Sequence, residues 1–341
     1  MEIKSNNKNL QSAKNGKKDE FYTQISDIEK ELKHYKHHFK DKVVYCNCDD
    51  PTVSGFFHYF SHNFEKLGLK KLITTCYKSQ YVDLFSQHNN EKAIYLEYTG
   101  DKNQNKLPEL DEIKINYLDG DGDFRSKECI ELLKQSDIVV TNPPFSLFRE
   151  FVSQLVRYEK KFLILGNLNA VTYKEIFTQF KLNKVWFGAS IHSGDREFMV
   201  PSHYPLEASG FRIDIEGNRY IRVKGVRWFT NLDYDELHED LILYKTYNPT
   251  EYPTYDNYDA IEVSKTKDIP IDYQGFMGVP ITFLDKYNPD QFEIVGSDYE
   301  VKEGILPFII KKDWKGKVDR AYLNGKRMYA RLLIRNKKPI L

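Results

Sequence analysis

The chain of 341 residues is long enough for one large domain or for a domain with a smaller companion. Its 24 tyrosines and 22 phenylalanines exclude an intrinsically disordered protein, because disordered segments are poor in aromatic side chains. The sequence has no run of about 18 apolar residues, no apolar leader at its start and no Cys-x-x-Cys pair, so we expect a soluble, cytoplasmic protein with reduced thiols.

The formal net charge is zero, but basic residues gather at the two ends of the chain. Residues 1–18 carry five lysines and one glutamate, and residues 311–341 carry eleven lysines and arginines against two aspartates. We expect a flexible basic arm over residues 1–18 and a basic C-terminal tail. Basic ends on an acidic middle suit a nucleic-acid partner, because neutralised phosphates supply most non-specific affinity. Ordinary solvated termini give the same pattern, so charge alone does not choose between the two interpretations.

Strand and helix patterns alternate from residue 19 to about residue 190. Short apolar runs predict strands, and apolar side chains at three- and four-residue spacing predict helices. This alternation predicts a doubly wound α/β sheet over residues 19–190. The predicted strands are residues 42–48, 69–77, 93–98, 112–118, 138–140, 160–166 and 184–189. The predicted helices begin near residues 25, 52, 147 and 171.

Beyond residue 190 the alternation stops, and the chain becomes rich in loops, tyrosine and proline. Residues 211–214 and 219–223 alternate in period two around Gly217-Asn218, which predicts a β-hairpin. We therefore assign residues 191–341 partly to the last strands of the sheet and mostly to a region with a separate role.

The most informative stretch joins the strand at residues 138–140 to the helix that follows it. The strand stops at Pro143 and Pro144, which cannot donate hydrogen bonds to a sheet, so Asn142 is expected at its carboxyl end. Ser146 is placed to cap the following helix. Open α/β sheets bind their ligands at this edge.

The side chains at this edge suit a planar amine. The Asn142 carboxamide oxygen and the Pro143 carbonyl are two rigid acceptors, and Phe145 is a flat apolar surface beside them. An exocyclic amine such as adenine N6 can donate both hydrogens to these acceptors while its ring stacks on the aromatic side chain. A proline turn that merely ends a strand is the structural alternative. The complete Asn-Pro-Pro-Phe sequence between a strand and a helix favours the functional interpretation.

Asn-Pro-Pro-Phe resembles the catalytic motif of amino-group methyltransferases that use S-adenosylmethionine. More narrowly, the chain is similar to the EcoRI-type DNA adenine-N6 methyltransferases in residues 19–24, 43–51, 120–126, 136–150 and 268–284. The resemblance implies a Rossmann-like S-adenosylmethionine-dependent methyltransferase sheet with a loop-rich C-terminal target-recognition region. It also implies methyl transfer to N6 of an adenine that is flipped out of a short site in duplex DNA.

The resemblance also implies roles for particular residues. Catalysis falls to Asn142, Pro143, Pro144 and Phe145. The expected S-adenosylmethionine contacts are Phe21, Tyr22, Thr23, Asn47, Cys48, Asp49, Asp50, Tyr77, Asp121, Asp123, Phe124 and Asn142. The glycine-rich loop usual after the first strand is absent, and only Gly55 lies in range. No metal is expected, because the calcium-like loop that begins at Asp119 has Ile130 where such a loop needs glutamate.

Double-stranded DNA is the partner that the resemblance implies, with residues 191–341 holding the target-recognition region. Arginines there are candidates for base edges or phosphates, and the basic ends for phosphates. The candidate DNA-binding residues are Lys14, Lys17, Lys18, Arg212, Arg219, Arg222, Arg227, Lys326, Arg327, Arg331 and Arg335. We expect a monomer that forms the modification half of a restriction-modification system and needs no direct contact with a cognate endonuclease encoded nearby.

Two other functions stay compatible with the sequence. Similar loops serve enzymes that methylate an amine or amide of RNA or protein, because those targets are planar too. A catalytically inactive DNA-binding protein on the same fold is an alternative of another class, because the glycine-poor loop leaves cofactor binding open. A cytosine-C5 methyltransferase is excluded: its nucleophilic cysteine normally follows a proline, and none of the four cysteines does.

Overall fold

A computed structural model describes residues 21–48, 54–75, 93–103, 105, 108–109, 111–200, 204 and 210–340. The chain divides into two compact units, which are described separately. The first comprises Met1–Ile176 and Gly188–Leu232, and the second comprises Phe177–Phe187 and Asp233–Leu341. Residues 177–187 thus belong to the second unit, and residues 188–232 return to the first. No described helix is long and apolar enough to cross a membrane.

The described part of the first unit is built around a large mixed β-sheet. β1 pairs in parallel with β2 and with β5, and β5 pairs in parallel with β6. β3 is antiparallel to both β2 and β4, so β4 runs in the same direction as β1 and ends at the same edge. β11 is antiparallel to β6. The strands lie in the spatial order β4 (Ile113–Tyr117), β3 (Ile94–Tyr98), β2 (Lys71–Thr75), β1 (Val43–Asn47), β5 (Ile138–Thr141), β6 (Lys161–Asn167) and β11 (Val226–Thr230).

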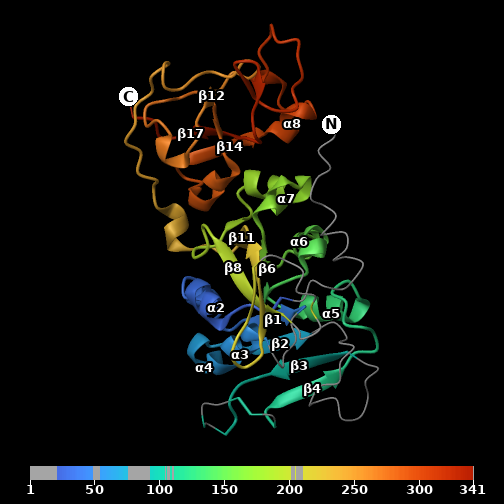
Figure 1. Ribbon diagram of the computed structural model, residues 1–341. Helices are drawn as coiled ribbons and strands as arrows, with labels where there is room; N and C mark the ends of the chain where they lie inside the picture. The colour runs from blue at the N-terminus through green and yellow to red at the C-terminus, as the bar shows by residue number, and fades with distance from the viewer. Residues whose placement is uncertain are drawn as a thin grey trace. The chain divides into compact units, whose positions relative to one another are not determined.

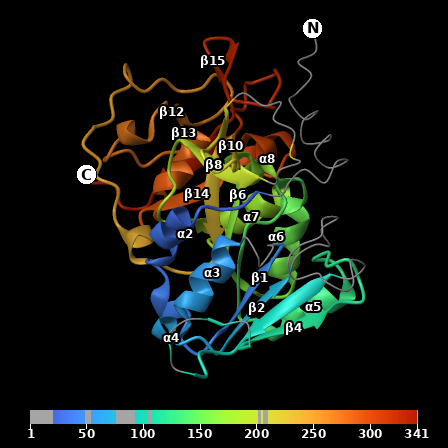
Figure 2. The same ribbon diagram turned by 60° about the horizontal axis from the view of Figure 1, so that its bottom comes forward.

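Helices cover both faces of this sheet (Figures 1 and 2). One face carries α2 (Ile25–Leu32), α3 (Gly55–His62) and α4 (Phe64–Leu67). The other carries α5 (Lys127–Gln135) and α6 (Phe148–Arg157). Crossovers between parallel strands are right-handed. The crossover from β1 to β2 and the crossover from β5 to β6 run in opposite directions along the sheet, so their helices cover opposite faces. The predicted doubly wound α/β class is confirmed, and the winding changes direction between β1 and β5.

Local sequence sets the ends of these helices. The Ser54 hydroxyl accepts a hydrogen bond from the Phe57 N–H at 3.1 Å and caps α3. Gly68 ends α4 in the left-handed region at φ +62°, a conformation that glycine adopts without steric cost. The prediction that Ser146 caps the next helix is wrong. A 3₁₀ turn over Phe145–Leu147 follows the prolines, so α6 begins at Phe148 with Leu147 at the N-cap.

A smaller antiparallel sheet also belongs to the first unit. Its order is β8 (Asp195–Val200), β10 (Arg219–Lys224) and β9 (Phe211–Ile213). β9 and β10 form the hairpin predicted around Gly217-Asn218, with Gly217 at φ +85° and the Asp214 N–H donating to the Asn218 carbonyl at 3.0 Å. That prediction is confirmed.

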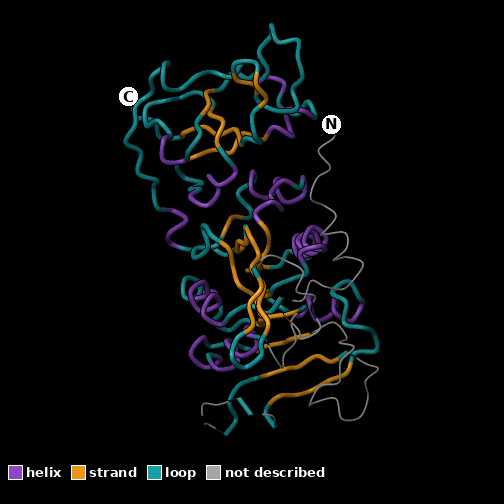
Figure 3. The backbone as a smooth tube through the Cα atoms, viewed as in Figure 1, coloured by secondary structure: helices purple, strands orange, loops and turns teal. Residues whose placement is uncertain are grey.

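The second unit holds another sheet among its described residues, in the order β12 (Ile261–Glu262), β13 (Met277–Val279), β17 (Leu332–Asn336) and β14 (Phe292–Ser297). β17 pairs antiparallel with both β13 and β14, so residues 332–336 form a central strand. For these residues the expectation of a basic tail is wrong. Loops make up most of the remaining chain in this unit (Figure 3). Its other described α-helices and strands are α7 (Lys174–Lys181), at which the chain enters this unit, β7 (Trp186–Phe187), α8 (Asp298–Lys302), β15 (Tyr322–Leu323) and β16 (Lys326–Arg327).

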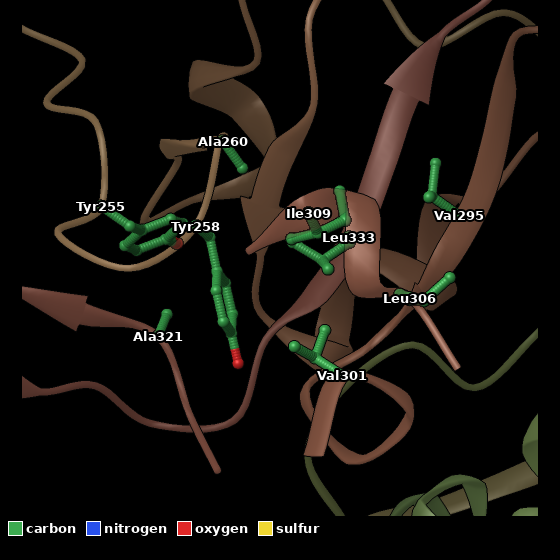
Figure 4. Packing of buried hydrophobic residues seen from close by; sticks show 9 residues of the cluster. All are labelled: Tyr255, Tyr258, Ala260, Val295, Val301, Leu306, Ile309, Ala321 and Leu333. Atoms are coloured by element: carbon green, nitrogen blue, oxygen red, sulfur yellow. The ribbon is translucent and has the colours of Figure 1, made fainter. Parts of the chain in front are cut away.

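Two fully buried tyrosines, Tyr255 and Tyr258, belong to the core of the second unit (Figure 4). Around them pack aliphatic side chains from the sheet and from the loops: Ala260, Val295, Val301, Leu306, Ile309, Ala321 and Leu333. The Tyr258 hydroxyl donates to the Val318 carbonyl at 3.1 Å, which satisfies its polar end. The loop-rich chain thus has its own packed interior.

Asp298 lies in this unit with only 2% of its surface exposed, and burial raises its pKa to about 6. A carboxyl whose folded pKa exceeds its ordinary value contributes most to stability below pH 4, and that contribution is lost as the pH rises through 6. We therefore expect Asp298→Asn, which resembles the neutral acid, to stabilise the protein at pH 8 by up to about 3 kcal/mol. Urea unfolding at pH 8 and pH 4.5 measures this difference. An equal difference at both pH values would contradict the prediction.

Candidate active site

The Asn-Pro-Pro-Phe stretch leaves the sheet where β5 ends. All four residues of β5 are buried, and Asn142 directly after them is 7% exposed. Pro144 is extended, with φ −53° and ψ 122°, and leads through the 3₁₀ turn into α6. Buried side chains of α6, including Phe151 and Leu155, fix the far end of the loop. Both ends of the loop are therefore held by buried elements, which gives its polar groups a defined orientation.

The Asn142 carboxamide makes one hydrogen bond and has one open acceptor. Its Nδ2 donates to the Phe21 carbonyl at 2.7 Å. Its Oδ1 is buried and has no hydrogen-bond partner within the described residues. A buried acceptor without a partner costs roughly 1–3 kcal/mol, so folded proteins rarely retain one without a function. The arrangement leaves Oδ1 available to a donor from outside the chain.

Aromatic rings surround this amide. Phe145 contacts Phe21 with ring centroids 5.6 Å apart and lies 6.5 Å from Phe198 of β8. Phe21 in turn contacts Phe198 at 5.7 Å and Tyr204 at 6.1 Å. We call Phe21, Phe145, Phe198 and Tyr204 the aromatic cluster. Phe21, Phe145 and Tyr204 are half-buried, so part of the aromatic surface of the cluster stays exposed.

Two more buried polar side chains lie on segments that meet this edge. Asn47 ends β1, and its backbone carbonyl accepts a hydrogen bond from the Thr141 hydroxyl, so the ends of β1 and β5 are adjacent. Both polar atoms of the Asn47 side chain, and the Thr23 hydroxyl, are buried without a partner in the described part of the chain. Cys48 follows in the left-handed region at φ +63°. This edge therefore presents unsatisfied donors and acceptors that suit a polar ligand.

The loop after β4 packs against α6. Phe124 packs edge-on against Phe151 with centroids 5.1 Å apart, and its carbonyl accepts from Gln154 Nε2 at 3.0 Å. The Arg125 guanidinium bonds to Asp123 at 2.6 Å and thereby lowers the pKa of that carboxyl. Exposed Asp121 accepts from the Asp123 N–H at 3.1 Å. The described residues contain no group of three or more His, Cys, Asp or Glu that could hold a metal ion.

Several predicted site residues lie outside the residues that the structure describes. They are the cofactor candidates Asp49, Asp50 and Tyr77 and the DNA candidates Lys14, Lys17 and Lys18. The roles predicted for them stay predictions.

The predicted DNA-binding arginines of the first unit differ in accessibility. Arg212 lies over the Tyr220 ring at 4.1 Å and pairs with Glu197 at 2.6 Å, and Arg222 is exposed on the neighbouring strand. Arg219 donates to the Tyr204 carbonyl at 3.4 Å. Arg227 is 4% exposed and donates to the carbonyls of Val226 and His192. The prediction of a DNA contact at Arg227 is wrong, because its guanidinium is buried and donates its hydrogen bonds to backbone carbonyls.

The basic residues of the second unit divide in the same way. Lys326 is exposed on β16, while Arg327 pairs with Asp319 at 2.7 Å and Arg335 with Glu293 at 2.5 Å, both at the surface. Arg331 is only 9% exposed and pairs with buried Glu262 at 2.8 Å. The predicted phosphate contact at Arg331 is therefore corrected, because this guanidinium stabilises the interior of the unit.

The sequence did not point to Phe198, Met199 and Tyr204, which belong to the surroundings of the loop at Asn142–Phe145. Tyr22 and Met199 form an antiparallel bridge, with N···O distances of 2.9 and 3.2 Å, and this places Phe198 against Phe21. The only local signal was the alternating pattern of β8. Such a pattern predicts a strand but does not indicate which residue it pairs with.

The chain matches known methyltransferases over nearly its whole length. The family model described as adenine-specific methyltransferase EcoRI matches residues 9–337. Identity is 51% to the type II methyltransferase M.EcoRI of Escherichia coli, over 99% of each chain. It is 41% to the type II methyltransferase M.MgeORF184P of Mycoplasma genitalium and 39% to the type II methyltransferase M.MpnI of Mycoplasma pneumoniae, each over 96% of this chain and 98% of the relative. No solved structure matches the chain.

The chain therefore belongs to the EcoRI-type family of adenine-specific methyltransferases. The prediction of an adenine-specific DNA methyltransferase of the restriction-modification type is confirmed. A methyl donor and a DNA substrate follow from this class.

Proposed function

We propose that this enzyme transfers a methyl group from S-adenosylmethionine to N6 of an adenine flipped out of a short duplex site. One observation carries the proposal: at the carboxyl end of β5, Asn142 has a buried Oδ1 without a partner among the described residues, and the half-buried Phe145 follows three residues later. An N6 amino group supplies the missing donor. A planar base supplies a ring that stacks on the phenylalanine.

The chain's own groups act mainly by positioning. Asn142 Oδ1 and the Pro143 carbonyl accept the two N6 hydrogens, which directs the nitrogen lone pair away from the ring plane. Phe145 holds the ring, and the rest of the aromatic cluster holds Phe145. No strong base is needed before transfer, because the alkylated nitrogen releases its proton easily. Fixing two reactants in this way supplies much of the rate enhancement of such enzymes.

The residues at the sheet edge fit S-adenosylmethionine. That molecule carries an ammonium, a carboxylate, ribose hydroxyls and an adenine ring, and when bound it supplies an electrophilic methyl group. The unsatisfied Asn47 carboxamide and Thr23 hydroxyl are suited to the polar groups, and Phe124 and the loop after β4 to the adenine end. Phe21, Tyr22, Cys48, Asp121 and Asp123 stay the further proposed contacts.

DNA must reach this edge with its target base outside the stack, at a cost of roughly a few kcal/mol. We assign phosphate or base contacts to the β8–β10–β9 sheet, where Arg212 and Arg222 share one face with Tyr220. Lys326 and the surface arginines Arg327 and Arg335 are the corresponding candidates in the second unit. The enzyme acts as a monomer in this proposal, because each strand of a site is methylated in a separate event.

Expression in a host without DNA methylation, followed by single-molecule sequencing of the genome, tests the proposal. We expect N6-methyladenine at one short motif and none in cells that carry an empty vector. If no methylated motif is found, calorimetric titration of the purified protein with S-adenosylmethionine shows whether the cofactor binds. Cofactor binding without a modified motif would move the target to RNA or protein. A protein that binds DNA but not the cofactor would be the inactive DNA-binding protein.

A further inference from the structure

The Asn142 side chain has one orientation that satisfies its surroundings. The Phe21 carbonyl lies 2.7 Å from Nδ2 and can only accept a hydrogen bond. Turning the amide over would place Oδ1 against this carbonyl, oxygen against oxygen, in a site that is 93% shielded from water. The Phe21 carbonyl therefore decides which end of the Asn142 amide remains open.

The position of Phe21 is in turn set by β8. Tyr22 and Met199 exchange two backbone hydrogen bonds, and the Phe21 ring contacts Phe198 at 5.7 Å. Met199 is opposite Tyr220 in the β8–β10 register, but its N–H and C=O both point to Tyr22. The ladder between β8 and β10 therefore does not use these two groups.

A second connection joins the same parts. Glu31 of α2 is fully buried, and its carboxylate accepts hydrogen bonds from the N–H groups of Ala189 and Ser190, each at 2.8 Å. These two residues begin the segment that leads into β8. The segment from Phe21 through α2 and the segment from Ala189 through β8 are thus bonded at two places.

We propose that the Phe21 carbonyl is a positioning group that requires an amide donor at residue 142, and that β8 holds this carbonyl in place through Met199. The inference rests on the proposed role of Asn142 Oδ1. It implies that asparagine is needed for its N–H as well as for its oxygen. It also implies that the sheet carrying Arg212 and Arg222 is linked by hydrogen bonds to the catalytic amide.

The variant Asn142→Asp tests the requirement for a donor. Its ionised carboxylate has no hydrogen to offer the Phe21 carbonyl, but its protonated form has one and still leaves an oxygen for N6. We expect its single-turnover methylation rate, divided by the wild-type rate, to rise about tenfold per pH unit as the pH falls from 8 toward the pKa of the new carboxyl. Asn116→Asp on the exposed strand β4 is the isosteric control and should give a constant ratio. A flat Asn142→Asp ratio, including one that stays at zero, overturns the inference.

Thermal unfolding of Asn142→Asp gives a readout that needs no activity. The carboxylate facing the Phe21 carbonyl should lower Tm at pH 8, and the deficit relative to wild type should shrink as the pH falls to 5. A deficit that does not change with pH overturns the inference. If the wild-type protein did not methylate DNA but Asn142→Asp still showed the pH-dependent Tm deficit, the proposed function would be rejected. The positioning role of the Phe21 carbonyl would be retained.

A proline at residue 199 tests the part played by β8. Met199→Pro removes the N–H that donates to the Tyr22 carbonyl, whereas Met199→Ala keeps both backbone bonds and measures the loss of the side chain alone. One hydrogen bond corresponds to roughly 1 kcal/mol, so we expect Met199→Pro to transfer methyl about threefold to tenfold more slowly than Met199→Ala in single turnover. DNA dissociation constants should agree within about twofold between the two variants. Equal transfer rates would show that β8 does not hold the carbonyl.

Discussion

Replacing Asn142 by alanine should abolish methyl transfer while leaving a folded protein that still binds DNA. The substitution removes the open acceptor at the end of β5 and leaves β5, α6 and the aromatic cluster without a steric conflict. Loss of a single preorganised polar group at a reacting centre typically lowers kcat by a factor of about 100 to 1000. For this site we expect the upper end, because in the proposed function Oδ1 accepts a hydrogen from N6, the nitrogen that is methylated.

Single-turnover methylation and DNA binding by fluorescence anisotropy measure the two halves of this prediction. Asn116→Ala, on β4 at the edge of the sheet, is a matched control, since among the described residues its side chain makes only a 3.5 Å contact with the Lys114 carbonyl. A turnover of Asn142→Ala within tenfold of wild type would remove Asn142 from the mechanism. A large loss of DNA affinity would assign it to substrate binding instead of catalysis.

Removing Arg331 should destabilise the protein by about 3–5 kcal/mol, because it leaves a buried carboxylate without its partner. Burial raises the pKa of Glu262, but hydrogen bonds from Arg331 and Tyr255 outweigh it and hold the pKa below its ordinary value. The pair is therefore ionised at neutral pH, with side chains 9% and 5% exposed. Arg331→Met keeps much of the side-chain volume and removes only the charge and its donors.

Arg335 on the same strand supplies the control for this prediction. Its pair with Glu293 is about half exposed on both sides, and exposed pairs contribute only about 0–1 kcal/mol. Urea unfolding should therefore separate Arg331→Met from Arg335→Met by several kcal/mol. The double variant Glu262→Gln, Arg331→Met should recover part of the loss, because no unpaired charge remains. Equal stabilities of the two single variants would show that the buried pair makes no special contribution.

The strand and the helix on either side of Asn142 and the two prolines could be predicted because their signals are local. An apolar run over residues 138–140, two prolines and an amphipathic helix follow one another closely, and each is recognised from neighbouring residues. The doubly wound sheet followed for the same reason, since its strands and helices alternate in order.

Roles that depend on distant partners could not be predicted in this way. Arg331 and Arg335 look alike in the sequence. Arg331 is structural because it pairs with buried Glu262, which lies 69 residues earlier in the chain. The bridge between Tyr22 and Met199 likewise depends on tertiary pairing, and so does the approach of Phe198 to Phe21. The residue pattern of neither segment indicates that the two segments pair with each other.

The second unit is discontinuous in sequence, which constrains how it can be exchanged between related enzymes. Residues 177–187 belong to it although they precede 45 residues of the first unit, 188–232. Lys181 pairs with Glu300 at 3.0 Å, Asn183 accepts from the Tyr287 hydroxyl at 2.5 Å, and the Phe187 carbonyl accepts from the Tyr234 hydroxyl at 2.8 Å. A chimera that exchanged only residues 233–341 with a relative would set these three residues against foreign partners. Recombination can transplant this unit intact only as two pieces, so a crossover at a single point produces a mismatched hybrid.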